Sequence, residues 1–394
     1  MIIELHLLQS FPVSNLNRDD VGSPKTVRFG GVTRARVSSQ SLKRAARELF
    51  VKNGLDEADL GVRTKRLPER AGEALSRRRD CDAALAQRVA AVALESLGIG
   101  VDETRNMSKY LLFVGKTAVN RLVQHCDEHW EDLAEVVVKR DEEREARAKA
   151  TREKKQRKPK KIDAPKAPRG VDTDVFRASK TADVALFGRM IADNKDFTVD
   201  SASQVAHALS THAAVNEFDY YTALDDLKKD DEPGADMIGT VDFNAACYYR
   251  YANLDLATLG KNLEGDEELL SRSVKAWLSS FIHAVPGGKQ NSMAARTVPD
   301  VLLGVVRTGG AWGLANAFLN PVGGNPDLMG QSADAMNRYY EDIQSFYGAQ
   351  EIEHVAYASV GGTLRNVSGP DGATPADTVD EFVAGLMSAA GAAH

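Results

Sequence analysis

The hydrophobic positions near the start of the chain predict a strand, a loop, a second strand and a helix. Residues 2–8 (IIELHLL) are mostly apolar and have the length of a strand, which predicts a half- or fully buried first strand. After a loop rich in Gly, Pro, Asn and Ser, residues 32–38 alternate as in a short strand. The apolar positions from Leu42 to Phe50 then follow the 3.6-residue period of a helix, whose expected N-cap is Ser38 or Ser39.

The rest of the chain continues this mixture of strands and helices. The expected helices span 83–100, 107–126, 202–212, 266–283 and 375–390, and the expected strands span 241–251, 301–306 and 354–360. Residues 216–243 are polar, acidic and contain turn residues, which predicts a projecting hairpin or loop. Because strands and helices are interleaved without a regular βαβ rhythm, we expect an α+β fold. A split-βαβ palm, with the charged middle of the chain inserted into it, fits this order.

Composition excludes several classes of protein. The chain has 394 residues, 43% of them hydrophobic, which is typical of globular domains. No apolar run approaches the roughly 20 residues that span a bilayer, and the apolar start lacks the basic residues of a signal peptide. Three cysteines cannot form a disulfide framework in a chain of this length. We expect a soluble, cytoplasmic protein with no membrane partner.

The net charge of −6 conceals two basic regions. Residues 1–79 hold 16 Lys and Arg against 9 Asp and Glu, a charge of +7, and residues 139–169 hold 14 against 6, a charge of +8. The remaining residues therefore carry −21. Because a ligand responds to the local field, this asymmetry allows a nucleic-acid partner that the net charge would argue against.

One short basic segment surrounds the start of the first predicted helix. Within residues 18–47 the only acidic residues are Asp19 and Asp20, whereas the basic residues are Arg18, Lys25, Arg28, Arg34, Arg36, Lys43, Arg44 and Arg47. Basic side chains, serine hydroxyls and the N–H groups of a helix N-terminus are common phosphate ligands. The segment therefore indicates contact with a nucleic-acid backbone. The alternative is the ordinary solvated face of an amphipathic helix.

Two further segments have features of nucleic-acid-binding proteins. Phe218, Tyr220 and Tyr221 lie in the turn-rich hairpin, where exposed rings can stack on bases. The tyrosines within 248–251 are expected to pack in the interior instead. The loop 286–292 (PGGKQNS) offers Lys289 and backbone N–H groups to phosphate, but it lacks the spacing of a nucleotide-binding P-loop.

Signals for catalysis and metal binding are weak. Asp19 and Asp20 offer carboxylates to a divalent cation, but a salt bridge with the preceding arginine is the simpler interpretation. His125 and His129 flank a cysteine on a predicted helix, yet no second cluster with metal-ligand spacing follows. No hydrolase or metalloprotease motif is present. We expect no enzyme activity, no bound metal and no cofactor.

Several motifs in a fixed order give the sequence a resemblance to a known family. They are LNRDD (16–20), FGG (29–31), RARVSSQSLKRAAR (34–47), FGRM (187–190), AHALSTH (206–212), TALDDL (222–227), YRYANLDL (249–256) and VPGGKQ (285–290). Together they resemble the crRNA-binding backbone subunit of type I-E CRISPR Cascade, the CasC family. The resemblance runs from residue 1 to about residue 320.

The resemblance implies a ferredoxin-like (RRM-like) palm, a helical fingers insertion and a β-hairpin thumb. The implied boundaries are 1–60 for the first part of the palm, 61–185 for the fingers with the charged segment 139–169, 186–212 for palm, 213–243 for the thumb, and 244–394 for palm and C-terminal elements. Copies in this family form a helical filament on crRNA together with other Cascade subunits. The filament presents the guide for pairing with target DNA.

The resemblance also implies roles for individual residues. Those in motifs that grip the RNA backbone are Arg18, Lys25, Ser38, Gln40, Lys43, Arg44, Arg47 and Lys289. Those that match the thumb wedge, which flips one nucleotide out of the stack at regular intervals, are Met190, Tyr220, Tyr221 and Thr222.

The charged segment 139–169 is longer and more charged than the resemblance implies. We hypothesise that it contacts duplex DNA beside the target without sequence preference, because clustered Lys and Arg side chains neutralise phosphates. The candidate residues are Lys139, Arg140, Arg144 and Arg147. A solvated linker is the alternative.

Three functions agree with these features. The first, which the motifs favour, is a non-catalytic guide-RNA scaffold in which base pairing supplies sequence specificity. The second is a metal-dependent ribonuclease like the related backbone subunits of type III complexes, with Asp19 or Asp20 as the catalytic carboxylate. The third is a generic single-strand RNA-binding protein that works without a complex.

Overall fold

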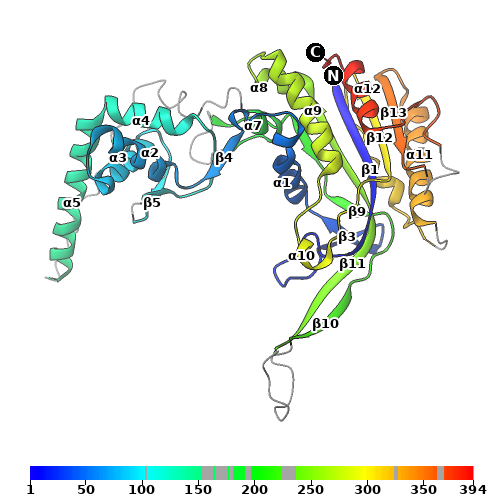
Figure 1. The fold of residues 1–394 in the computed structure, drawn as a ribbon, viewed down its shortest axis with the longest axis horizontal. Helices are drawn as coiled ribbons and strands as arrows, with labels where there is room; N and C mark the ends of the chain where they lie inside the picture. Colours follow the sequence, from blue (N-terminus) through cyan, green and yellow to red (C-terminus); the bar gives the residue numbers. More distant parts are fainter. Residues whose placement is uncertain are drawn as a thin grey trace, which may run out of the picture. The chain divides into compact units, whose positions relative to one another are not determined.

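The protein is described by a computed structural model (Figure 1), which covers residues 1–102, 104–152, 163–164, 176, 181–190, 197–223, 237–323, 327–361 and 368–393. The chain divides into two compact units. The sheet unit comprises Met1–Leu55, Ala202–Lys261 and Gly265–His394, and the helical unit comprises Asp56–Ser201 and Asn262–Glu264. The sequence predicted an insertion at 61–185, and the unit that interrupts the sheet unit runs from 56 to 201.

The sheet unit is built around one large mixed sheet. Its strands are β1 (Ile2–Ser14), β2 (Thr26–Phe29), β3 (Val32–Val37), β8 (Ser203–Val205), β9 (Ala208–Ser210), β10 (Glu217–Ala223), β11 (Met237–Asp255), β12 (Val301–Arg307), β13 (Ile352–Ser359) and β14 (Thr374–Pro375). The order across the sheet is β14-β13-β12-β1-β11-β9-β3-β2, and β8 and β10 also pair with β11. Only β13 and β14 run parallel among these pairs.

Helices pack on both faces of this sheet. They are α1 (Ser39–Leu49), α8 (Leu256–Asn262), α9 (Glu267–His283), α10 (Gln290–Met293), α11 (Leu328–Tyr347) and α12 (Val379–Ala389), with short 3-10 helices η1 (Val51–Asn53) and η4 (Leu314–Phe318). On one face, α11 and η4 share an apolar cluster with the strand residues Leu8, Tyr249 and Leu303. On the other face, α12 packs so closely on β12 that a side chain at Gly304 would strike Leu386.

The first strand and the first helix form as the sequence predicted. β1 pairs with β11 and β12, and helices cover both faces of the sheet, so its apolar run is buried on both faces and does not alternate. Ser38 is the N-cap of α1, and its hydroxyl accepts a hydrogen bond from the N–H of Ser41 at 3.3 Å. The buried face of α1 carries Leu42, Ala45 and Ala46.

The helical unit has its own apolar core. Its elements are η2 (Glu57–Asp59), β4 (Gly61–Thr64), α2 (Leu67–Arg79), α3 (Ala83–Ser96), β5 (Val101–Asp102), β6 (Met107–Ser108), β7 (Leu112–Gly115), α4 (Ala118–Glu128), α5 (Trp130–Arg152) and α7 (Ala182–Phe187). Leu75 of α2, Val89 of α3 and Leu122 of α4 meet in this core and are fully buried. No helix in the described parts of the chain is long and apolar enough to cross a membrane.

Two predicted helices were wrong, wholly or in part. Residues 202–212 form β8 and β9 instead of a helix, because they pair with β11 and β3. Residues 107–126 contain β6 and β7 before α4 begins at Ala118. The predicted strands at 241–251, 301–306 and 354–360 and the helices at 83–100, 266–283 and 375–390 are confirmed, with small shifts of their ends.

Candidate nucleic-acid interface

The N-terminus of α1 is built to receive an anion. Its first turn carries no acidic side chain, and the N–H groups of Ser39 and Gln40 lie at the start of the helix, where intrahelical partners are lacking. The backbone N–H of Ser38 donates to the Asn17 side-chain oxygen at 2.9 Å, which holds this end of the helix in place. A helix N-terminus with these properties attracts phosphate.

The same asparagine belongs to the loop 15–25, which is fixed at several points. The side-chain amide of Asn15 donates to the backbone oxygens of Gly22 and Asp242, at 3.0 and 2.9 Å. The N–H of Lys25 donates to the backbone oxygen of Asn17 at 2.9 Å. The loop is thereby tied both to α1 and to the base of the β10–β11 hairpin, and it presents Arg18 on its exposed surface.

The loop 286–290 packs directly on this first loop. A Cβ atom at Gly288 would lie 2.4 Å from the backbone oxygen of Leu16, so only glycine permits the approach. Gln290 is buried and donates to the backbone oxygens of Pro286 and Ala295, which closes the loop on itself. Lys289 between them has a left-handed backbone, with φ of +50°, and a half-buried side chain.

The structure thus brings together three separate segments that carry predicted RNA-binding residues. On α1, these residues occupy the face opposite the buried one and are Gln40, Lys43, Arg44 and Arg47. Arg44 forms an exposed pair with Glu48 at 2.9 Å, a type of pair that contributes little and opens readily for another anion. Lys43 and Arg47 are half-buried and have contacts of their own.

Not every basic residue of the segment 18–47 lies on this surface. Arg34 is fully buried, and its guanidinium donates to the backbone oxygens of Phe29, Ser210, Phe318 and Leu319. Burial lowers its pKa from the ordinary arginine value. Arg34 therefore holds β2, β9 and η4 together and is not available to a ligand.

Sequence reasoning missed His207, which joins Lys25 and Arg36 in a second positive cluster beside β3. Arg36 Nη1 lies 3.1 Å from Nδ1 of His207, and Arg36 Nε donates to the backbone oxygen of Thr26 at 3.3 Å. The N–H of Arg36 donates to the backbone oxygen of Lys25 at 2.8 Å. Burial and the neighbouring charges of Arg36 and Lys25 lower the pKa of His207. The chain offered only a weak signal for this cluster, because His207 lies 171 residues from Arg36.

The β10–β11 hairpin presents exposed aromatic side chains. Phe218 is 72% exposed, Tyr220 62% and Tyr221 43%. Because adjacent residues of a strand point to opposite faces, Tyr220 and Thr222 share one face and Tyr221 lies on the other. The ring of Tyr221 covers Gly239 on β11, where a Cβ atom would lie 2.5 Å from the ring. The tip of the predicted hairpin, 224–236, lies outside the described residues.

The fourth predicted wedge residue belongs to the other unit. Met190 follows α7 in the helical unit and is 81% exposed, which is unusual for methionine. The interior role expected for the tyrosines at 248–251 is confirmed for Tyr248 and Tyr249, both 3% exposed. The hydroxyl of Tyr249 lies 2.8 Å from Nδ1 of His6.

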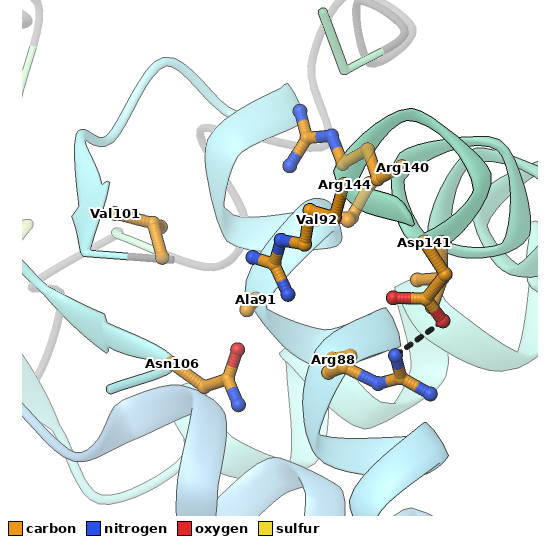
Figure 2. Close-up of a pocket in the computed structure, with 9 residues that line it drawn as sticks. Arg88, Ala91, Val92, Val101, Asn106, Arg140, Asp141 and Arg144 are labelled. Atoms are coloured by element: carbon orange, nitrogen blue, oxygen red, sulfur yellow. Dashed lines mark hydrogen bonds and ion pairs between the residues drawn. The ribbon is translucent and has the colours of Figure 1, made fainter. Parts of the chain in front are cut away.

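The predicted DNA-binding residues of the fingers lie on α5 and are partly engaged. Arg140 pairs with Glu95 at 2.7 Å, largely shielded from solvent, and Lys139 pairs with Glu135 one turn earlier. Arg144 lines a small hollow between α3 and α5, together with Arg88 and Arg140 (Figure 2). The hollow encloses about 30 Å³, too little for a nucleotide. The side chain of Arg147 and most of 153–180 lie outside the described residues.

The carboxylates proposed for a metal site do not converge. One oxygen of Asp19 accepts the N–H groups of Val21 and Ser23, at 3.1 and 2.9 Å, so this side chain shapes the turn. Asp20 is exposed beside it. Within the described ranges, no three His, Cys, Asp or Glu side chains gather as metal ligands. Burial raises the pKa of Cys126 to about 12, which keeps that thiol protonated and a poor ligand.

Comparisons with known proteins give the family and match the fold of the whole chain. The model of the family described as CT1975-like protein matches residues 3–384. A chain of a solved "CRISPR RNA-guided surveillance complex, pre-nicking" is 29% identical, with a TM-score of 0.80 over 98% of this chain and 100% of that chain. A chain of a "CRISPR RNA-guided surveillance complex" is 26% identical, with a TM-score of 0.72 over 100% of both. No curated protein matches the chain.

Because the family model and the two solved chains match nearly the whole length of this chain, it is a protein of the CRISPR Cascade type. The resemblance found in the sequence motifs is confirmed at this level. The chain belongs to the family of CT1975-like proteins.

Proposed function

We propose that this chain is the crRNA-binding backbone subunit of a type I-E Cascade complex. In this role it polymerises along the guide RNA in the cytoplasm, grips the RNA backbone without catalysing a reaction, and presents the guide to target DNA. The observation that supports this proposal is the convergence of the 15–25 loop, the N-terminus of α1 and the 286–290 loop on one surface. Basic side chains and helix N–H groups contact phosphates without reading the nucleotide sequence. A scaffold that must accept any guide RNA requires contacts of this kind.

We further propose that the sheet unit is the ferredoxin-like palm and that the β10–β11 hairpin is the thumb. The elements β1, α1, β9, β11, α9 and β12 follow one another in the β-α-β-β-α-β order of that fold. Across the sheet they lie in the order β12-β1-β11-β9, which is the split arrangement expected for it. The helical unit then takes the place of the fingers.

The simplest test is the RNA that purifies with the protein. The chain, expressed together with a CRISPR array and the other subunits of its complex, should retain one discrete short RNA on a denaturing gel. RNA of undefined length would favour a generic single-strand binding protein instead. Cleavage of complementary RNA in Mg²⁺, abolished by Asp20→Ala, would contradict the non-catalytic role.

The charged segment of the helical unit is proposed to contact duplex DNA that flanks the target. The proposed contacts come from Lys139, Arg140, Arg144, Arg147 and the basic residues that follow them in the sequence, and the ion pair of Arg140 with Glu95 must open for its guanidinium to reach a phosphate. Deletion of 149–166 should weaken target-DNA binding and reduce its dependence on salt. Unchanged affinity and an unchanged salt slope would show that the segment is a solvated linker.

A further inference from the structure

The cluster of Lys25, Arg36 and His207 lies on a different side of the sheet from α1. Ala35 and Val37 of β3 belong to the apolar cluster that contains Leu42 of α1. Because side chains alternate along a strand, Arg36 points to the opposite face. The cluster therefore flanks the end of β3, only two residues along the chain from the N-cap Ser38, but it is separated from the helix by the sheet itself.

The geometry of this cluster leaves hydrogen-bond donors facing solvent. Since Arg36 is always protonated, it donates to Nδ1 of His207, and the proton of the neutral imidazole resides on Nε2. His207 is exposed, and Lys25 and Arg36 are half-buried. Within the described residues, none of the three forms an ion pair with a carboxylate.

Lys25 and Arg36 carry like charges, and a protonated His207 would add a third positive charge beside them. The charges that act on His207 come from Arg36 on β3 and from Lys25 before β2, and both disfavour a second positive charge on the imidazole. An anion placed among the three groups reverses this balance, because it attracts all of them at once.

We propose that Lys25, Arg36 and His207 form a phosphodiester-binding subsite for guide RNA, at which His207 takes up a proton when the RNA binds. The proton is taken up at Nδ1, so the hydrogen bond from Arg36 to that atom opens, and the arginine and the imidazolium both donate to the phosphodiester oxygens instead. This inference rests on the proposed RNA-binding function, to which Lys25 already belongs, and adds Arg36 and the protonation of His207 to it. Proton uptake makes binding stronger as the pH falls, by at most tenfold per pH unit for one proton. The site also extends the positive surface around the end of β3, from α1 on one face to His207 on the other.

A purely structural role for the pair is the competing explanation. The Arg36–His207 contact also links β3 to the segment just before β9, and it could serve only to hold these strands together. A structural contact predicts loss of stability on substitution and no linkage between RNA affinity and pH. The two explanations therefore differ in a measurable way.

The test is the pH dependence of RNA affinity in wild type and three variants. Binding of a fluorescent single-stranded RNA is followed by anisotropy from pH 5.5 to 7.5 at constant salt. The RNA carries a 5′-hydroxyl, because a terminal phosphate would itself titrate near pH 6. His207→Gln keeps an oxygen that can accept from Arg36 but cannot be protonated. His207→Lys carries a permanent charge, and His354→Gln, on β13 at the far side of the sheet, is the matched control.

Wild type and His354→Gln should bind about three- to tenfold more tightly at pH 5.5 than at pH 7.5. His207→Gln should lose most of this dependence, and His207→Lys should bind more tightly than wild type at pH 7.5, a gain that misfolding cannot produce. A His207→Gln variant that titrates like wild type would overturn the subsite while leaving the RNA-binding function intact. Failure of wild type to bind RNA at every pH would overturn both.

Discussion

Replacing Gly288 by alanine should weaken RNA binding and destabilise the sheet unit, whereas the same change at Gly287 should do neither. A Cβ atom at Gly288 would lie 2.4 Å from the backbone oxygen of Leu16 and 2.5 Å from that of Asn15. A Cβ atom at Gly287 would have no heavy atom within 4 Å. Both obstructing atoms at Gly288 belong to the backbone, so no side-chain rotation can relieve the contact.

The size of the effect follows from these distances. Real Cβ atoms essentially never approach another heavy atom within 3.0 Å, so the loop 286–290 must retreat by at least about 0.6 Å. Overpacking of this kind costs about 1–3 kcal/mol of stability. Lys289 moves with the loop, and a hydrogen bond to a charged group contributes about 1.5–3 kcal/mol. Loss of half that contact predicts roughly three- to tenfold weaker RNA binding.

The assay combines RNA anisotropy with chemical denaturation. Lys289→Ala serves as a second variant that should lose RNA affinity without a change in the denaturation midpoint, because it removes the contact and leaves the packing. If Gly288→Ala matched Gly287→Ala in both measurements, the close packing of the two loops would be refuted. If Gly288→Ala were destabilised but bound RNA normally, the position of Lys289 would not matter for binding.

Three other predictions test separate parts of the protein. Lys43→Ala should weaken binding to RNA of any sequence and reduce the salt slope by roughly 0.7, measured by titration at several salt concentrations; a loss confined to certain bases would contradict a backbone contact. Tyr221→Ala should retain guide RNA but impair pairing with target DNA in a gel-shift assay; pairing equal to that of wild type would contradict the wedge role. Burial raises the pKa of Glu4 from 4.5 to about 7, so the folded protein holds the carboxyl proton more tightly than the unfolded chain does. The stability that this proton contributes is fully present below about pH 4.5 and is lost as the pH rises through 7. Glu4→Gln should therefore unfold in urea with roughly 3 kcal/mol more stability than wild type at pH 8, and with no such gain at pH 4.5; equal differences at both pH values would contradict this account.

The fold was predictable where the determining interactions are local. The cap at Ser38 and the period of the apolar residues that follow are both encoded within one helix, and both were read correctly. Residues 202–212 were misread because their alanines favour a helix, whereas the strands β8 and β9 form through pairing with β11 and β3. Strand pairing with distant segments leaves no periodic signal in so short a stretch.

The site divides in the same way, and the division has a practical consequence. The density of basic residues in the segment 18–47 indicated an anion-binding surface. It could not show that Arg34 is buried and structural whereas Arg36 reaches the surface. What separates them is long-range: Arg34 donates to the backbone of Phe318, 284 residues away, whereas Arg36 meets His207 because β9 pairs with β3. Substitution of either arginine should lower RNA binding, but for different reasons. Removal of Arg34 takes away a fully buried guanidinium and its hydrogen bonds to four backbone oxygens, which destabilises the sheet beneath the site, whereas removal of Arg36 takes away a ligand. A mutational scan of basic residues that measured RNA binding alone would therefore count Arg34 as an RNA ligand. Measuring the stability of the same variants distinguishes the structural arginine, Arg34, from the RNA-binding arginine, Arg36.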